Sequence, residues 1–184
     1  MDKLAVLFPG IGYTNDRPLL YYSAYVARHK GYEVKKLEFK DLPDGVFNDE
    51  KKIMRCFELS LDQAGQALSQ IDFSGYADVI FISKSLGTAV AAVYASKHNI
   101  DVRHIWYTPL DKSLSLAKPG TGIAFHGTSD PWADTNVLND VCAKRNIPLH
   151  IIENANHSLE TGDLAADLSI LDGILSVISD YIGY

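Results

Sequence analysis

The sequence predicts an α/β protein, a three-layer α/β/α sandwich around a six-stranded, mainly parallel sheet. Short apolar segments rich in β-branched and aromatic residues alternate along the chain with longer segments whose apolar side chains recur at helical spacing. Glycine, proline and asparagine separate these segments. The chain has 184 residues, of which 47% are hydrophobic and 22% charged, so a single domain over residues 1–184 is expected.

The chain begins with an expected strand from Leu4 to Phe8, which Pro9 and Gly10 end. A helix is expected to run from the neighbourhood of Pro18 to about Lys30, because Asn15 or Asp16 could cap its first turn. Glycine at the following position, 31, is typical of a helix end.

The next elements lead to the centre of the sheet. Residues 32–39 alternate between apolar and polar side chains, which predicts a strand with one polar face near a sheet edge. After a loop over 41–49, apolar residues at helical spacing predict a helix over 50–70. Residues 78–83 have the composition of a buried strand, and an apolar helix is expected over 86–95.

The second half of the chain continues the alternation. Its last helix carries leucine and isoleucine at helical spacing from Leu164 to Ile182, and this stripe is expected to face the core. The expected elements are strands at 102–107, 122–126 and 149–153, helices at 132–146 and 163–182, and a short polar connection over 110–121.

Composition argues against several kinds of partner. The net charge of −6 does not favour nucleic acid or an anionic membrane surface. No run approaches the roughly 20 apolar residues of a membrane span, and the first apolar run is too short for a signal peptide. Cys56 and Cys142 show neither a metal-ligand spacing nor a disulfide framework, so reduced thiols in a cytoplasmic protein are expected. The oligomeric state is not indicated.

Cofactor patterns are also missing from the sequence. Gly10-Ile11-Gly12 is not followed by a third glycine three positions on, because position 15 is asparagine, so a dinucleotide site is not expected. Histidines and acids show no metal-ligand spacing, and no metal is expected. The expected partner is a small-molecule substrate.

The junction of the third strand and its helix carries the most informative pattern. Ser83-Lys84-Ser85-Leu86-Gly87 follows Gly-x-Ser-x-Gly, in which a strained serine protrudes between strand and helix, with Ser83 at the first glycine position. Ser85 is the predicted nucleophile, and a simple helix cap is the alternative. Lys84 is expected to be exposed to solvent, although it could instead attract an acidic substrate.

Two later strand ends supply an acid and a base. Asp130 follows the fifth strand and His157 the sixth, and the carboxyl ends of parallel strands lie at one edge of a sheet. A serine hydroxyl needs a base to accept its proton and a carboxylate to orient that base. Asp130 and His157 therefore complete a predicted triad with Ser85. Asp134 is the alternative acid, and Asp130 could instead cap the following helix.

Other polar and aromatic residues have less specific interpretations. His126 ends the fifth strand and is expected to have a structural role. Several aromatic residues could line a pocket, although aromatic residues more often belong to the core. These residues are Tyr13, Tyr21, Tyr22, Trp106 and Trp132.

Over essentially its whole length the chain resembles a small, cap-less α/β-hydrolase of the esterase and dienelactone-hydrolase type. The serine motif, the loop Gly127–Asp130 and the pair Asn156–His157 match that family's pattern and order. Phe8–Tyr13 resembles its oxyanion loop, with Pro9 where many members have histidine. The family's two further N-terminal strands are absent, so a minimal form of the fold is expected.

The resemblance implies roles for individual residues. Ser85 would be the nucleophile, His157 the general base and Asp130 the orienting acid, as the residue types themselves suggest. The oxyanion hole would be formed by the backbone N–H groups of Leu86 and of Ile11 or a neighbour. Substrate contacts would come from the same early loop, from Gly10, Gly12 and Tyr13.

The expected function is hydrolysis of a carboxylic ester through an acyl-enzyme intermediate. Only about 14 residues separate Tyr107 from Gly122, where related proteins often insert a cap domain, so an open site is expected. A thioesterase, deacylase or peptidase with the same triad is an alternative. A non-catalytic binding protein that keeps the fold is a third.

Overall fold

A computed structural model describes residues 2–183 and contains a six-stranded sheet in the order β2-β1-β3-β4-β5-β6. Every neighbouring pair of strands is parallel, which confirms the predicted fold class. The edge position predicted for the second strand is also confirmed, because β2 pairs only with β1. The strands are β1 (Lys3–Phe8), β2 (Tyr32–Lys36), β3 (Asp78–Lys84), β4 (Arg103–Tyr107), β5 (Gly122–Gly127) and β6 (Leu149–Ile152).

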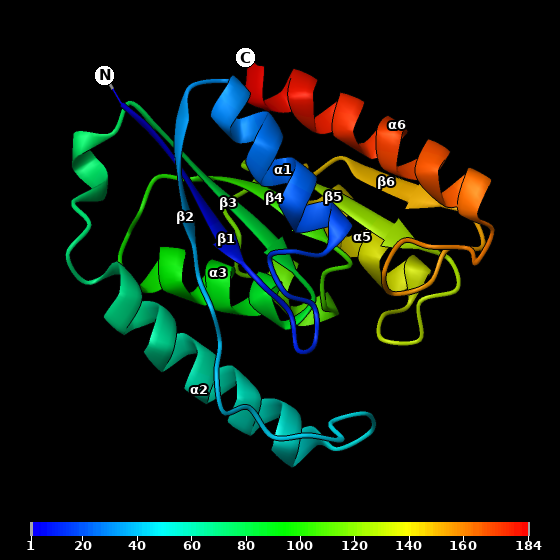
Figure 1. Ribbon diagram of the computed structural model, residues 1–184. Coiled ribbons are helices and arrows are strands. Elements are labelled where there is room, and N and C mark those ends of the chain that lie inside the picture. The colour runs from blue at the N-terminus through cyan, green and yellow to red at the C-terminus, as the bar shows by residue number, and fades with distance from the viewer. Residues whose placement is uncertain (1, 184) are drawn as a thin grey trace.

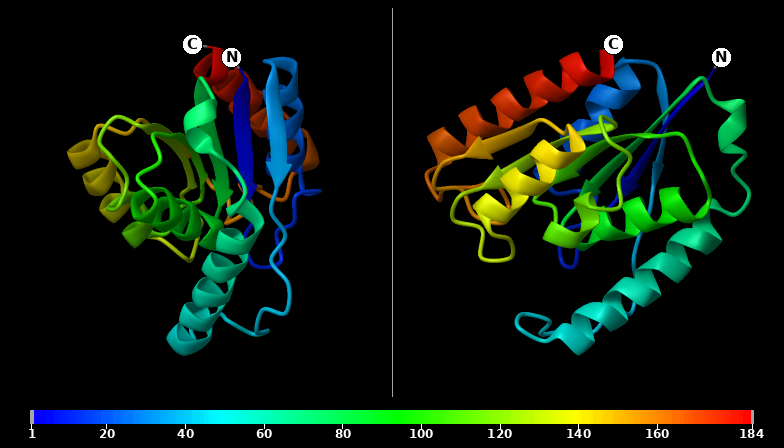
Figure 2. Two further views of the ribbon diagram at one scale, coloured as in Figure 1. Left: turned by 90° about the vertical axis from the view of Figure 1, so that its left-hand side faces the viewer. Right: turned by 180° about the vertical axis from the view of Figure 1, so that it is seen from behind.

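Helices cover both faces of the sheet (Figures 1 and 2). On one face lie α1 (Pro18–His29) and α6 (Leu164–Gly183), which pack against each other and against the strands. On the other face lie α2 (Glu50–Leu68), α3 (Leu86–Lys97), the short α4 (Asp111–Leu114) and α5 (Thr135–Arg145).

Strand β3 shows how alternation divides the core. Ile80 and Ile82 belong to the cluster with α1 and α6, whereas Val79 and Phe81 belong to the cluster with α2 and α3. Side chains two positions apart share a face of a sheet. Lys84, two residues after Ile82, therefore lies on the α1/α6 side at the carboxyl end of β3.

The start of α1 differs from the prediction, because neither Asn15 nor Asp16 caps the helix. Arg17 is the N-cap residue and makes no side-chain capping bond. Asn15 instead donates from Nδ2 to the carbonyl of Leu37 at 2.6 Å, and Asp16 pairs with Lys36. Both side chains thus tie the loop after β1 to the chain around the end of β2.

The structure also differs from two other expectations, one for α6 and one for the connection over 110–121. Leu164 and Leu168 are 74% and 59% exposed, so the apolar stripe of α6 faces the core only in its later turns, around Ile174 and Ile178. The first turns of α6 lie near the tip of β6, at the carboxyl edge of the sheet (Figure 1). The expected polar connection over 110–121 contains α4 and buries Leu114.

The helices of residues 2–183 include none that is both long enough and apolar enough to cross a membrane. Cys56 and Cys142 are free thiols in the interior.

Candidate active site

Ser85 lies in a strained turn between β3 and α3. Its backbone has φ +52° and ψ −123°, a conformation that residues other than glycine rarely adopt. Hydrogen bonds from Ser85 N to Tyr107 O at 3.0 Å and from Thr88 N to Ser85 O at 2.9 Å hold it there. The turn therefore has the backbone geometry of a nucleophile elbow, as the motif predicts.

The elbow depends on the close approach of the end of β1. A Cβ atom on Gly87 would lie 2.3 Å from Phe8 O and 2.5 Å from Pro9 O, so only glycine fits at this position. A Cβ on Gly10 would lie 3.1 Å from Ser85 Cβ, which places the early loop directly beside the serine.

The early loop folds into a tight turn next to Ser85. Gly10 N donates to Tyr13 O at 3.2 Å, and Tyr13 N donates to Gly10 O at 3.4 Å, so Ile11 and Gly12 form the tip. Leu86 is the first residue of α3, and an N–H at this position has no acceptor in a preceding helical turn. The positive end of the α3 dipole also lies here. A negatively charged oxygen near Ser85 would be stabilised by this arrangement.

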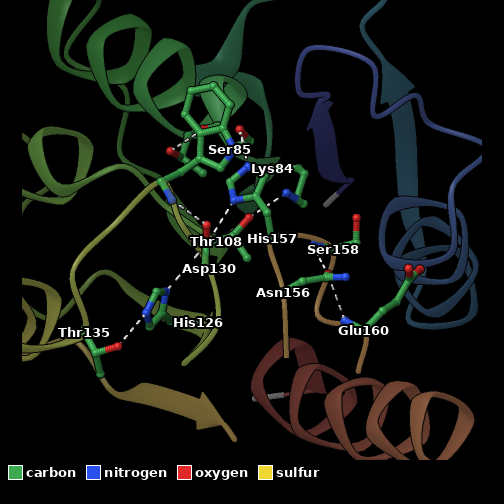
Figure 3. A network of polar contacts seen from close by, with 12 residues as sticks. Lys84, Ser85, Thr108, His126, Asp130, Thr135, Asn156, His157, Ser158 and Glu160 are labelled. Carbon is green, nitrogen blue, oxygen red and sulfur yellow. Dashed lines mark hydrogen bonds and ion pairs between the residues drawn. The ribbon is translucent and has the colours of Figure 1, made fainter. Parts of the chain in front are cut away.

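The structure brings the three predicted triad residues together (Figure 3). His157 Nε2 lies 2.7 Å from Ser85 Oγ, and His157 Nδ1 lies 2.7 Å from Asp130 Oδ2. Ser85 follows β3, Asp130 follows β5 and His157 follows β6, so three neighbouring regions of one sheet edge supply the set.

Asp134, the alternative acid, lies outside this set. Its carboxylate caps α5, accepting hydrogen bonds from Asn136 N at 2.8 Å and Val137 N at 3.1 Å. Asp130 also accepts a backbone hydrogen bond, from Trp132 N at 2.9 Å, but through Oδ1, which leaves Oδ2 for His157. The capping alternative and the triad position of Asp130 are therefore compatible.

The loop that carries His157 is held in place by hydrogen bonds within it and by contact with the end of β5. Asn156 Oδ1 accepts hydrogen bonds from Ser158 N at 2.7 Å and Glu160 N at 3.3 Å, and Asn156 N donates to Glu160 O at 2.8 Å (Figure 3). A Cβ on Gly127 would lie 2.2 Å from Ala155 O, so the end of β5 touches this loop backbone to backbone.

Burial and charge set the protonation of the triad. Burial lowers the pKa of His157, and Lys84 and His126 lower it further, whereas the hydrogen bond to Asp130 acts in the opposite direction. Burial would raise the pKa of Asp130, but the bond from His157 and neighbouring charges hold it below its usual value. At neutral pH the pair is therefore a carboxylate and a neutral imidazole, which suits His157 as a proton acceptor.

His126 lies beside Asp130 on the side away from Ser85 (Figure 3). Its Nε2 is 2.9 Å from Thr135 Oγ1, and its Nδ1 is 3.9 Å from Asp130 Oδ2. The ring is buried and links the end of β5 to the start of α5, a structural placement.

Trp132 forms an aromatic wall with Phe47, a residue that the sequence did not single out. The Trp132 ring centroid lies 5.8 Å from that of His157, and Phe47 meets Trp132 edge-to-face at 4.9 Å. Phe47 belongs to the loop before α2 and is 55% exposed. Its only signal in the sequence is an aromatic side chain in the loop over 41–49.

The other aromatic candidates occupy different places. Tyr13 is buried, and its hydroxyl accepts a hydrogen bond from Leu19 N at 3.1 Å. Trp106 is buried in the cluster with α5, whereas Tyr21 and Tyr22 on α1 are about half exposed.

The expectation that Lys84 is exposed is wrong. Its side chain is only 1% exposed, because the carboxyl end of β3 directs it beneath the loops that follow β1, β4, β5 and β6. Lys84 Nζ donates to Thr108 Oγ1 at 2.6 Å and lies 5.0 Å from the centre of the Tyr13 ring.

Other candidate features lie away from the triad or are missing. A groove of about 880 Å³ opens at the amino ends of β3 and β4, where Arg103 pairs with Asp78, at the opposite edge of the sheet. Among residues 2–183, no group of three or more histidine, cysteine or acidic side chains could hold a metal ion.

Several solved structures described as α/β-hydrolases share this architecture. The chain superposes on an α/β serine hydrolase homologue from Coxiella burnetii with a TM-score of 0.65 at 12% identity, covering 99% of this chain and 83% of that one. An α/β serine hydrolase without a lid from Xanthomonas campestris gives 0.63 at 14% identity, covering 95% and 82%. Est1E from Butyrivibrio proteoclasticus, with bound ferulic acid, gives 0.62 at 11% identity, covering 96% and 90%.

At these identities the likeness concerns the fold alone, and it confirms the fold that the motifs suggested. No protein-family model and no curated protein sequence matches the chain.

Proposed function

We propose, from the α/β-hydrolase fold that this chain adopts, that it is a serine hydrolase cleaving a carboxylic ester or a related acyl bond. The observation that carries the proposal is the continuous hydrogen-bond path from Ser85 Oγ through both nitrogens of His157 to Asp130, with 2.7 Å at each step. A serine held in a strained turn and bonded to a neutral imidazole is the arrangement that acyl transfer requires.

In the first half of the proposed reaction, Ser85 Oγ attacks the carbonyl carbon and His157 Nε2 accepts the hydroxyl proton. Asp130 stabilises the imidazolium that forms and keeps Nδ1 in its protonated tautomer. The tetrahedral intermediate then collapses, and His157 returns the proton to the departing alcohol. An acyl group remains on Ser85.

In the second half, water attacks the acyl group while His157 accepts a proton from it. Collapse of the second intermediate releases the carboxylic acid and restores the Ser85 hydroxyl. In both halves the carbonyl oxygen becomes negative, and the N–H groups of Leu86 and Ile11 are proposed to hold it. The loss of one such donor costs about 2.7–4 kcal/mol of barrier in a well-studied case.

The surroundings favour an ester with an apolar group on the His157 side. Phe47 and Trp132 form a half-exposed aromatic wall next to His157, and such a surface binds flat apolar groups. The connection between β4 and β5 holds only α4, so no cap domain covers the site from there. We propose that the loop beside Ser85, with Gly10, Gly12 and Tyr13, supplies further substrate contacts in this open site.

The proposal is tested by the intact mass of the protein after exposure to a fluorophosphonate, followed by a panel of esters, thioesters and anilides. We expect one adduct, located on Ser85, and fastest turnover among the esters. A preference for thioesters or anilides would change the substrate class but keep the mechanism. A folded protein that takes up no probe would contradict the proposal and support the binding-protein alternative.

The choice between the two acids yields a prediction. Asp130→Asn is expected to lower kcat/KM by about 10²–10⁴-fold, because the amide no longer fixes the tautomer of His157 or stabilises its cation. Asp134→Ala, the matched control, removes only the cap of α5 and is expected to cost about 1 kcal/mol of stability with kcat/KM unchanged. Ester hydrolysis and thermal unfolding of both variants measure this. Equal losses of activity would contradict the assignment.

The depressed pKa of His157 yields a prediction for the pH profile. His157 must be unprotonated to accept the proton of Ser85, and its folded-state pKa lies below the ordinary 6.5. We therefore expect the rate of fluorophosphonate labelling to exceed half of its plateau at pH 6.5 and to reach half of the plateau only at a lower pH. A midpoint at or above 6.5 would contradict the burial argument.

A further inference from the structure

Lys84 is a buried cation that the proposed acyl transfer does not use. It directly precedes Ser85 in the chain, yet only 1% of its surface is exposed. Lysine is almost never fully buried without a partner, because removing an ammonium from water is costly. A buried lysine directly before Ser85 is therefore expected to influence the groups of the candidate site.

The contacts of Lys84 come from two loops that are themselves tightly held. Thr108 Oγ1 accepts a hydrogen bond from Lys84 Nζ at 2.6 Å, and Tyr13 presents its ring to the ammonium at 5.0 Å. Thr108 has φ +41°, a conformation that is strained for a β-branched residue, and Thr108 N donates to Phe125 O at 2.8 Å. The backbone after β4 is thus held in an unfavourable conformation at the residue that accepts from the lysine.

The charges around Lys84 are those of the triad. The carboxylates of Asp130 and Glu160 stabilise the ammonium, whereas Lys84 and a protonated His157 repel each other. His126 faces the same carboxylate from β5. The titratable or charged groups around the ammonium are Tyr13 after β1, Asp130 after β5, and His157 and Glu160 after β6.

We propose that Lys84 is a positioning residue whose buried ammonium keeps Asp130 ionised and His157 unprotonated, so that the base stays available to Ser85 under mildly acidic conditions. This inference rests on the proposed hydrolase function. Like charges in a region of low dielectric disfavour each other, and an opposite charge favours the carboxylate. The ammonium therefore opposes protonation of His157, which would prevent this residue from accepting the proton of Ser85.

The pKa values of Lys84 and His157 lie in the order that this role requires. Burial lowers the pKa of Lys84 to about 7, against the opposing effect of Asp130 and Glu160. The pKa of His157 is held below 6.5. As pH falls from neutrality, Lys84 thus takes up its proton ahead of His157, and the ammonium has largely formed when His157 titrates.

The decisive experiment is an NMR titration of the His157 ring in the intact protein, in Lys84→Met and in Ile82→Val. Methionine fills nearly the same space without charge, so the pKa of His157 is expected to rise by about one unit. Ile82 lies two residues before Lys84 on the same face, and its substitution disturbs packing but no charge. Ile82→Val is expected to titrate like the parent. An unchanged pKa in Lys84→Met would overturn the inference.

A second readout separates this inference from the proposed function. In Lys84→Met the pH at which the labelling rate falls to half of its plateau should rise by the same amount as the pKa of His157. The plateau rate at higher pH should match that of the parent. A loss of rate at every pH would indicate a merely structural role and overturn the inference. A parent protein that takes up no probe would refute the hydrolase function, while the NMR titration would still report on the electrostatic coupling.

If Lys84→Met does not fold, Lys84→Gln replaces it, because its amide can still donate to Thr108. The parent protein also offers a measurement without any substitution. Its His157 ring shifts are expected to show a second, smaller inflection near pH 7, where Lys84 loses its proton. The Lys84 side-chain resonances followed in the same samples identify its step, and His157 ring shifts that do not respond to that step would overturn the coupling.

Discussion

Replacing Ser85 with alanine is expected to lower the rate of ester hydrolysis by about 10⁴- to 10⁶-fold, because no hydroxyl remains to attack the carbonyl carbon and carry the acyl group. The fold should be unaffected, since the Ser85 backbone is held by its own N–H and carbonyl. Initial rates with a 4-nitrophenyl ester, together with the absence of a fluorophosphonate adduct, measure this. Residual turnover within about tenfold of the parent would refute Ser85 as the nucleophile.

Glycine at the same position is expected to separate activity from stability. Ser85→Gly should be as inactive as the alanine variant but more stable than the parent by about 1 kcal/mol, because glycine adopts φ +52° without strain. Ser83→Gly is the matched control: Ser83 is buried in β3 with ordinary backbone geometry, so glycine there should lower stability. Urea unfolding of both variants tests the point. Equal destabilisation would mean that the elbow stores no strain.

Gly127→Ala is the second substitution with a large expected effect. The added methyl group would lie 2.2 Å from Ala155 O and 2.9 Å from Asn156 O, and both are backbone atoms that cannot rotate away. The loop carrying His157 must therefore move away from the end of β5 and from Asp130. We expect a loss of about 10²-fold in kcat, since a misplacement of about 1 Å costs that much. Overpacking should also lower stability by about 1–3 kcal/mol.

Gly65→Ala is the control for this prediction. Gly65 lies in α2, and nothing is within 4 Å of a Cβ added there. Alanine is expected to raise stability by up to about 1 kcal/mol through helix propensity, with kcat unchanged. Steady-state kinetics and thermal melts of both variants are compared. A Gly127→Ala protein with parental kcat would contradict a tight coupling of the two loops.

The alternation of strands and helices was sufficient to predict the sheet, and the sheet in turn predicts the meeting of distant residues. Ser85, Asp130 and His157 are far apart in the chain, but each follows a strand of one parallel sheet, so the topology places them at one edge. The choice between Asp130 and Asp134 was left open by the sequence, which placed the start of the helix at 132; in the structure α5 begins at Thr135 and Asp134 caps it.

The features that the sequence did not predict depend on contacts between segments that are distant in the chain. Lys84 reads as a surface residue because lysine usually is one, and only the convergence of four loops buries it. Leu164 and Leu168 fit the helical stripe, yet both are mostly exposed in the first turns of α6. Phe47 meets Trp132 through a contact between segments 85 positions apart, which no local pattern encodes.

The position of β6 places the proposed base at an edge of the sheet. β6 has a neighbour on one side only, and the loop that leaves it carries the proposed base. Strands at a border fray more readily than central ones, because fewer hydrogen bonds must break. Detachment of β6 would separate His157 from Ser85 while β1, β3 and β4 remain paired and buried. On heating, the proposed hydrolase activity should therefore be lost at a lower temperature than that of global unfolding.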